Sequence, residues 1–80
     1  MRIQVFGAGC VPCKLMLQNV QQAVRELELP DEVEYVTRIQ DLLDAGITGT
    51  PTLKIDGEVV SVGRALDVPR IKQLFSSAGK

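Results

Sequence analysis

The sequence predicts a small α/β fold with the element order β-α-β-α-β-β-α, in which a four-stranded mixed sheet is flanked by three helices. Four short segments alternate apolar with polar residues, which is typical of strands. Three other segments repeat their apolar residues with the period of a helix. The chain has 80 residues, which suits one domain with a thin core, so we expect residues 1–80 to form a single domain.

The first strand is predicted over residues 3–6 and ends at the glycine-rich segment 7–9. A helix is predicted over about 10–28, because apolar residues return there at helical spacing, and Pro30 follows its end. The apolar stripe of this helix consists of Met16 or Leu17, Val20, Ala23, Val24 and Leu27.

A second strand is predicted over residues 33–36, and a short helix over 39–45 has Gly46 as its C-cap. Turn residues fill 47–51. Because a long helix separates the first two strands, we expect these strands to be parallel and joined by a right-handed crossover.

The last part of the chain is predicted to form a hairpin and a helix. Asp56-Gly57, between strands at 52–55 and 58–62, is a strong signal for a two-residue hairpin turn. Asp67 is expected to cap the final helix, and residues 76–80 are expected to form a frayed tail. The apolar face of the final helix consists of Val68, Ile71, Leu74 and Phe75. Helices are expected on both faces of the sheet.

Composition and charge exclude several classes of function. Nine Lys and Arg against ten Asp and Glu give a net charge of −1, so no basic surface for nucleic acid or an anionic membrane is expected. The chain has no His, which excludes His-based metal sites and Ser-His or Cys-His catalysis. Phe6, Tyr35 and Phe75 are the only aromatic residues, too few to stack on bases. Since this low aromatic content offers no obvious interface, we expect a monomer.

No segment predicts export or membrane insertion. No apolar run approaches the ~20 residues that a membrane-spanning helix needs, and no secretory signal precedes the first strand, so we expect a cytoplasmic protein. Two cysteines are too few for a disulfide-stapled scaffold or a four-ligand zinc site. In a reducing compartment such a pair is more typical of a reactive or metal-binding site.

Cys10-Val11-Pro12-Cys13 lies at the predicted start of the first helix. Residues three apart share one helical turn, which brings their Cα atoms to about 5–6 Å, a distance that a disulfide can bridge. Free N–H groups and the positive end of the helix dipole stabilise a thiolate at Cys10, so its pKa should fall below the ~8.5 of a free thiol. Pro12 suits this early helical position because no N–H partner is needed there.

Small residues around the first cysteine leave room for a second protein. Gly7 and Gly9 allow the disulfide of another protein to approach Cys10 closely, or they simply form a tight turn, and both roles are compatible. Lys14, one turn along, is either a source of positive potential or a solvated side chain.

Five segments spread over the whole chain carry a resemblance to a known family. They are Ile3-Gln4-Val5-Phe6-Gly7, Gly9-Cys10-Val11-Pro12-Cys13, Gly49-Thr50-Pro51-Thr52-Leu53, Ile55-Asp56-Gly57-Glu58 and Val62-Gly63-Arg64. Together they resemble the thioredoxin superfamily, and in particular its small single-domain redox-active disulfide proteins of glutaredoxin-like size. The fold that this resemblance implies is the thioredoxin-like one.

The resemblance also implies a cis peptide bond at Thr50-Pro51, lying against the cysteine motif. Such a bond turns the backbone groups of Thr50 outward beside Cys10, where a substrate strand can pair with them. The substrate-binding residues expected on this basis are Thr50, Pro51, Gly9, Val11 and Pro12.

Three positions depart from the family pattern. Thioredoxins carry a buried acid six residues before the first cysteine, where this chain has Gln4, so proton handling must rely on water or differ in detail. Thioredoxins place Trp where this chain has Gly9. Glutaredoxins hold glutathione with a Gly-Gly and acid signature, of which residues 63–67 keep one glycine. Arg64 is either a partner for a glutathione carboxylate or a solvated turn residue.

The resemblance implies a thiol–disulfide oxidoreductase that reduces protein disulfides. In that mechanism the Cys10 thiolate attacks a substrate disulfide, and Cys13 resolves the mixed disulfide. The chain has no cofactor-binding fingerprint, so no cofactor is expected, and no metal is assigned. The expected partners are disulfide-containing proteins as substrates and a flavin-dependent, thioredoxin-reductase-like enzyme as electron donor.

Two other functions stay open at this stage. A Cu(I) or Zn chaperone would use the same two thiolates, because they bind soft metals. Small metallochaperones, however, have the order β-α-β-β-α-β and usually carry Met where this chain has Ala8. The other alternative is a non-catalytic interaction domain that retains the fold.

Overall fold

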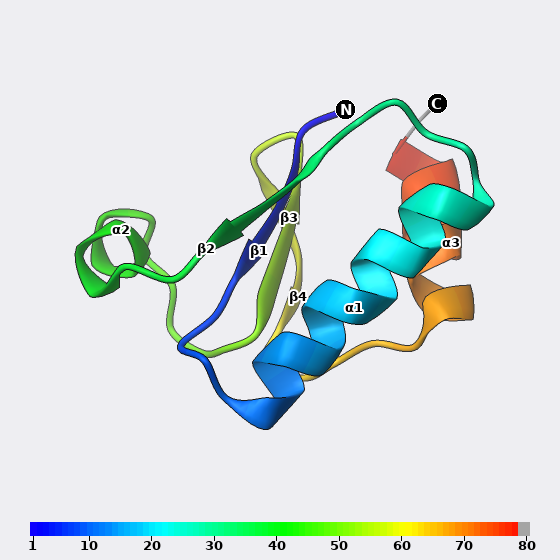
Figure 1. The fold of residues 1–80 in the computed structure, drawn as a ribbon. Helices are drawn as coiled ribbons and strands as arrows, with labels where there is room; N and C mark the ends of the chain where they lie inside the picture. Colours follow the sequence, from blue (N-terminus) through cyan, green and yellow to red (C-terminus); the bar gives the residue numbers. More distant parts are fainter. Residues whose placement is uncertain (79–80) are drawn as a thin grey trace.

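The computed structural model describes residues 1–78 and contains the elements in the predicted order (Figure 1). They are β1 (Ile3–Phe6), α1 (Val11–Glu26), β2 (Val33–Val36), α2 (Ile39–Asp44), β3 (Thr52–Ile55), β4 (Glu58–Val62) and α3 (Val68–Ala78). The predicted α/β class and the order β-α-β-α-β-β-α are confirmed.

The strands form one mixed sheet in the order β2-β1-β3-β4. β1 is parallel to β2, as expected for strands joined through a helix, and antiparallel to β3. β3 and β4 form the predicted hairpin. Its turn residues Asp56 and Gly57 have φ angles of 53° and 83°, the left-handed conformation that a type I′ turn requires at both positions.

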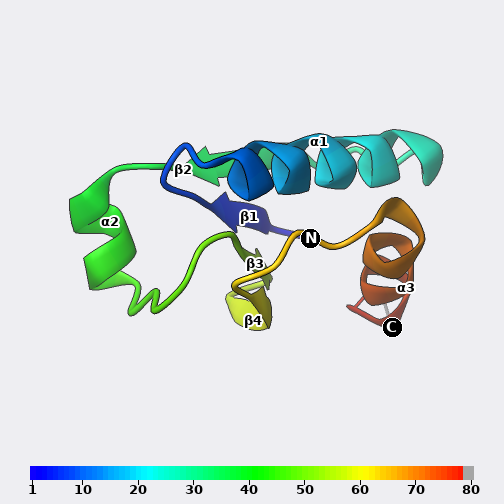
Figure 2. The same cartoon turned by 90° about the horizontal axis from the view of Figure 1, so that it is seen from below.

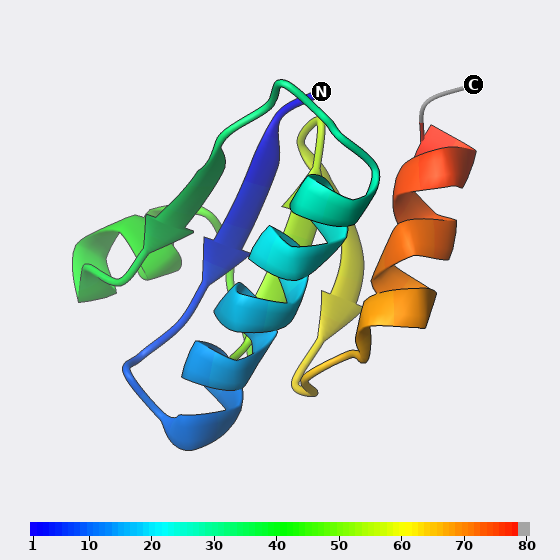
Figure 3. The same cartoon turned by 45° about the vertical axis from the view of Figure 1, so that its right-hand side comes forward.

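Helices lie on both faces of this sheet, as predicted. α1 and α3 pack side by side over one face, and α2 lies beyond the other face (Figures 2 and 3). The core lies between the sheet and the α1–α3 layer, and it is formed by Ile3, Val5, Met16, Val20, Ala23, Leu53, Ile55, Ile71 and Phe75. Because β1 is central, it is buried on both faces.

The short helix α2 contributes no residue to this core. Two of its apolar side chains, Ile39 and Leu43, are 75% and 66% exposed. Gly46 follows the helix with a φ of 71°, which agrees with its predicted role at the C-terminal end.

Helix ends differ in detail from the prediction. α1 ends at Glu26 rather than Glu28, because Glu28 takes a left-handed φ of 53° and the Leu29 N–H donates back to the Val24 carbonyl at 3.0 Å. α3 continues to Ala78, further than the predicted start of a frayed tail at Ser76, while residues 79–80 lie outside the described part of the chain.

The amino end of α3 has the predicted cap. The Asp67 carboxylate accepts a hydrogen bond from the Arg70 N–H at 3.0 Å, which satisfies one of the free donors of the first turn. Within residues 1–78, none of the helices combines the length and the apolar character required to cross a bilayer.

Candidate active site

The two cysteines lie at the amino end of α1, where the sequence placed them. Cys10 is the N-cap residue and has an extended backbone, and Cys13 lies in the first turn. Their sulfurs are joined in a disulfide, with the Cα atoms 5.0 Å apart. Pro12 lies in the first turn as well, where its missing N–H leaves no carbonyl unpaired.

The two cysteines differ in their exposure to solvent. Cys10 is half-buried, whereas Cys13 is fully buried against the core. The Cys10 Sγ atom accepts a hydrogen bond from the Cys13 N–H at 3.2 Å, so the sulfur occupies the place of a capping oxygen. An incoming group therefore reaches the first cysteine and not the second.

The residues directly next to Cys10 are uncharged. Gly9, Val11 and Pro12 are exposed, and Val11 is 80% exposed although it is apolar. Gly9 has a φ of 80°, a conformation that other residues rarely adopt. Lys14 is exposed on the next turn of α1, and its backbone N–H donates a hydrogen bond to the Cys10 carbonyl at 3.0 Å.

The register of the sheet brings Pro51 to the same end of the molecule. Phe6 pairs with Thr52 in antiparallel strands, so Gly7 and Pro51 come next to each other beyond that pair. A Cβ atom placed on Gly7 would lie 2.9 Å from the Cys13 Cβ atom, which connects this strand end to the disulfide. The Thr50-Pro51 peptide bond is cis, Pro51 is buried and Thr50 is half-buried.

Comparisons with known proteins place this chain among proteins that are similar to it over nearly its whole length. A family model described as the thioredoxin domain matches residues 1–76. The chain belongs to the thioredoxin family. It is 37% identical over 76 residues to a thioredoxin of Methanothermobacter thermautotrophicus, covering 95% of this chain and 99% of the relative. It is 32% identical over 75 residues to a thioredoxin of Methanocaldococcus jannaschii, covering 94% and 86%.

The predicted resemblance is thus confirmed, and the thioredoxin-family match includes both Cys10 to Cys13 and Thr50-Pro51. Family membership together with the joined cysteine pair supports thiol–disulfide oxidoreductase chemistry in general.

Gln4 occupies the position, six residues before Cys10, at which the sequence analysis noted a departure from the acid of thioredoxins. Its amide donates to the Glu34 carboxylate at 3.4 Å, and the two residues pair across β1 and β2. Gln4 and Phe6 line a hollow shared with α2, on the sheet face opposite α1. The amide therefore lies on the other side of the sheet from Cys13.

Arg64, the other residue for which the sequence left two roles open, is exposed in the segment after β4.

Two residues of this thioredoxin-family site were missed by the sequence analysis. Val62 ends β4 as an exposed apolar side chain, next to the backbone pair in which the Gly63 N–H donates to the Pro51 carbonyl at 2.9 Å. Tyr35, on β2, lies against Gly7 on the side of Cys13. Its place in an alternating strand, between Glu34 and Val36, was the available signal that it faces the core.

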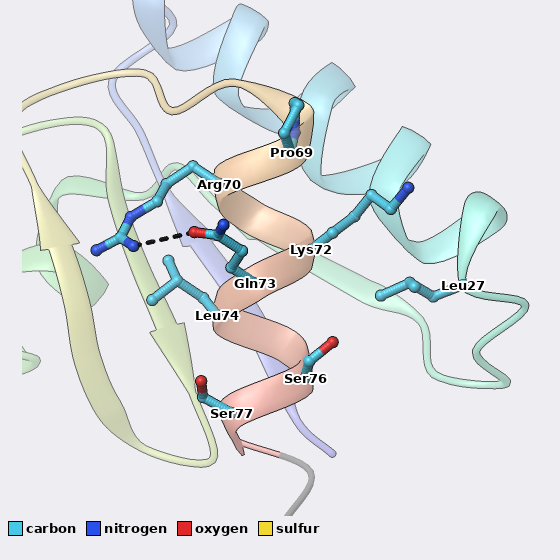
Figure 4. A pocket seen from close by; sticks show the side chains of 8 residues that line it. All are labelled: Leu27, Pro69, Arg70, Lys72, Gln73, Leu74, Ser76 and Ser77. Carbon is cyan, nitrogen blue, oxygen red and sulfur yellow. Dashed lines mark hydrogen bonds between the residues drawn. The ribbon is translucent and has the colours of Figure 1, made fainter.

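Another hollow lies along α3 and reaches Leu27 at the carboxyl end of α1 (Figure 4). Its lining residues are Leu27, Pro69, Arg70, Lys72, Gln73, Leu74, Ser76 and Ser77. Leu27 is the C-cap of α1, whereas Cys10 is its N-cap, so this hollow is separate from the disulfide. Across residues 1–78 no three or more His, Cys, Asp and Glu side chains cluster in a way that would hold a metal.

Proposed function

We propose that this protein reduces disulfide bonds in other proteins through a mixed disulfide at Cys10. The observation that carries the proposal is the unequal exposure of the two cysteines, with Cys10 half-buried at a helix start and Cys13 buried behind it. The asymmetry gives the two cysteines different roles, the accessible one as nucleophile and the buried one as resolving thiol.

The first step is attack by the Cys10 thiolate on a substrate disulfide. The Cys13 N–H and the free N–H groups at the start of α1 stabilise negative charge on this sulfur. A bond forms between Cys10 and one substrate sulfur, and the substrate S–S bond breaks. The electron pair leaves with the second substrate sulfur, which takes up a proton.

The second step closes the disulfide observed here. Cys13 lies one turn along the same helix, with its Cα atom 5.0 Å from that of Cys10. Its thiolate attacks the Cys10 sulfur, the bond to the substrate breaks, and the second substrate thiol is released. Two electrons have then passed from the dithiol to the substrate.

Substrate contact is proposed at the uncharged surface around Cys10. Gly9, Val11 and Pro12 form one side of it, and Thr50-Pro51 the other. An extended substrate segment that pairs with the backbone of Thr50 would lie across the disulfide. The exposed apolar side chains of Val11 and Val62 favour apolar substrate residues beside the substrate cysteine.

The oxidised protein must be reduced again by a partner. We propose a flavin-dependent, thioredoxin-reductase-like enzyme in the cytoplasm, acting on a monomer. Glutathione is the less favoured donor, because residues 63–67 keep one glycine of the glutathione signature. Metal transport is also disfavoured, because the chain has the order β-α-β-α-β-β-α and ends on a helix.

The test combines a reductase assay with a redox titration of the wild-type protein. The wild type should reduce a disulfide-bonded test protein with dithiothreitol as electron source, and Cys10→Ser should not. Equilibration with thiol/disulfide buffers should give a two-electron couple at roughly −270 mV, the value typical of a reductant.

Three results would contradict the proposal. Reductase activity in Cys10→Ser would show that the first cysteine is not the nucleophile. A couple above roughly −180 mV would indicate an oxidant or isomerase. The absence of a reversible couple, together with tight Cu(I) binding in a competition assay, would indicate the metal chaperone instead.

A further inference from the structure

The hydroxyl group of Tyr35 is buried and has no hydrogen-bond partner among the described residues. Buried polar groups are almost always paired, since an unpaired one costs free energy. Tyr35 therefore has a donor that the disulfide form leaves unused. The mechanism described above does not employ this group.

The unused donor lies next to the resolving cysteine. A Cβ atom placed on Gly7 would lie 2.9 Å from the Tyr35 hydroxyl oxygen and also 2.9 Å from the Cys13 Cβ atom. The hydroxyl and the Cys13 Cβ are thus no further apart than twice that distance. Because residue 7 is glycine, no side chain separates them.

The sheet register explains why Tyr35 reaches this place. Tyr35 pairs with Val5 in the parallel strands β1 and β2, and both residues face the α1 side of the sheet. The charged neighbours Glu34 and Lys54 belong to the opposite face, where Glu34 contacts Gln4 and Lys54 lies over the Phe6 ring. On α1, the nearby cation Lys14 is exposed to solvent.

We propose that the Tyr35 hydroxyl donates a hydrogen bond to the Cys13 sulfur when the protein is reduced. A disulfide sulfur is a weak acceptor, whereas a thiolate accepts a strong, charge-assisted hydrogen bond. Opening the disulfide therefore supplies the missing partner of Tyr35. This inference rests on the proposed function, because it assigns Tyr35 a role in the resolving step.

A hydrogen bond from Tyr35 does not change the proton and electron balance of the resolving step. The Cys13 thiolate attacks the Cys10 sulfur, and the electron pair of the Cys10–substrate bond leaves with the substrate sulfur. The proton that Cys13 loses passes to solvent, and the substrate thiolate takes one up. Tyr35 keeps its own proton and stabilises the Cys13 thiolate before the attack.

The experiment compares the full chain with Tyr35→Phe, which keeps the ring and removes the hydroxyl. The variant should hold its disulfide more tightly, shifting the equilibrium with a thiol/disulfide buffer about tenfold toward the oxidised form. That change equals roughly 30 mV toward more negative potential. In the reduced protein the pKa of the Cys13 thiol should rise, and the resolving step should need higher pH.

Gln4→Met is the matched control, because it removes a polar group from the opposite face of the same sheet. It should leave both the potential and the pKa of the Cys13 thiol unchanged. Equal values in wild type and Tyr35→Phe, or an equal shift in Gln4→Met, would overturn this inference while leaving the proposed function intact. A wild type without any reversible couple would overturn both.

Discussion

The N–H group of Cys13 donates a hydrogen bond to the Sγ atom of Cys10 at 3.2 Å. The sulfur that we propose as the nucleophile is therefore also the cap of α1. A thiolate at this place satisfies a free donor of the helix and is stabilised by the helix dipole. The hydrogen bond from the Cys13 N–H to the Cys10 sulfur therefore bears both on the stability of α1 and on the proposed reactivity of Cys10.

This dual role predicts different outcomes for two substitutions at Cys10. In the reduced protein, Cys10→Ser should keep nearly the wild-type stability, because a serine hydroxyl is a good N-cap. Cys10→Ala should lose about 0.5–2 kcal/mol, since no cap remains. Chemical denaturation under reducing conditions measures both values. Equal stability of the two variants would show that the sulfur does not cap the helix.

Replacement of the resolving cysteine should trap the substrate. Cys13→Ser leaves the accessible Cys10 able to form a mixed disulfide, but nothing buried behind it can break that bond. Incubation with a disulfide-bonded test protein should give a covalent adduct on a non-reducing gel, and dithiothreitol should remove it. The control Cys10→Ser should give none, and an adduct there would contradict the assignment.

Gly7→Ala should destabilise the protein, because a Cβ atom there would approach both the Cys13 Cβ and the Tyr35 hydroxyl to 2.9 Å. Overpacking of this kind costs roughly 1–3 kcal/mol. Gly49→Ala is the matched control, since the nearest atom to its Cβ would be a Val62 methyl carbon at 3.3 Å. Urea unfolding should show the larger loss for Gly7→Ala. The reverse order would contradict the tight contact.

The contact between Glu26 on α1 and Lys72 on α3 should make stability depend on pH. Hydrogen bonds from Gln22 and from the Lys72 ammonium, the latter at 3.0 Å, hold the pKa of Glu26 below its ordinary value. A lowered pKa in the folded state means that this stabilisation is present above the ordinary value of about 4.3. It is lost as the pH falls through the lower folded-state pKa.

Glu26→Gln should therefore cause a small decrease in Tm at pH 7 and none well below pH 4, where the wild type has lost the same charge. The effect is small because both side chains are more than a third exposed. Glu32→Gln, in an exposed loop position, serves as the control. A decrease of the same size at both pH values would show that packing, not charge, is responsible.

Most of the local structure could be predicted because its causes lie within a few residues. The Asp56-Gly57 turn depends on backbone conformations that these two residues tolerate, and Asp67 caps the helix that follows directly. The cysteine pair could be located for the same reason, since one helical turn joins Cys10 and Cys13. The end of α1 was placed two residues too late, because the left-handed conformation of Glu28 has no strong sequence signal.

The sequence by itself determined the element order, the cysteine pair and the glycines next to it, because short-range periodicity and spacing encode these features. Only the tertiary structure decided that Tyr35 and Cys13 both lie against Gly7, and that Gln4 lies on the other face of the sheet. The first of them depends on the pairing of Val5 with Tyr35, 30 positions further along the chain. They depend on strand register and on which face each side chain takes, and a shift of one residue would reverse the face.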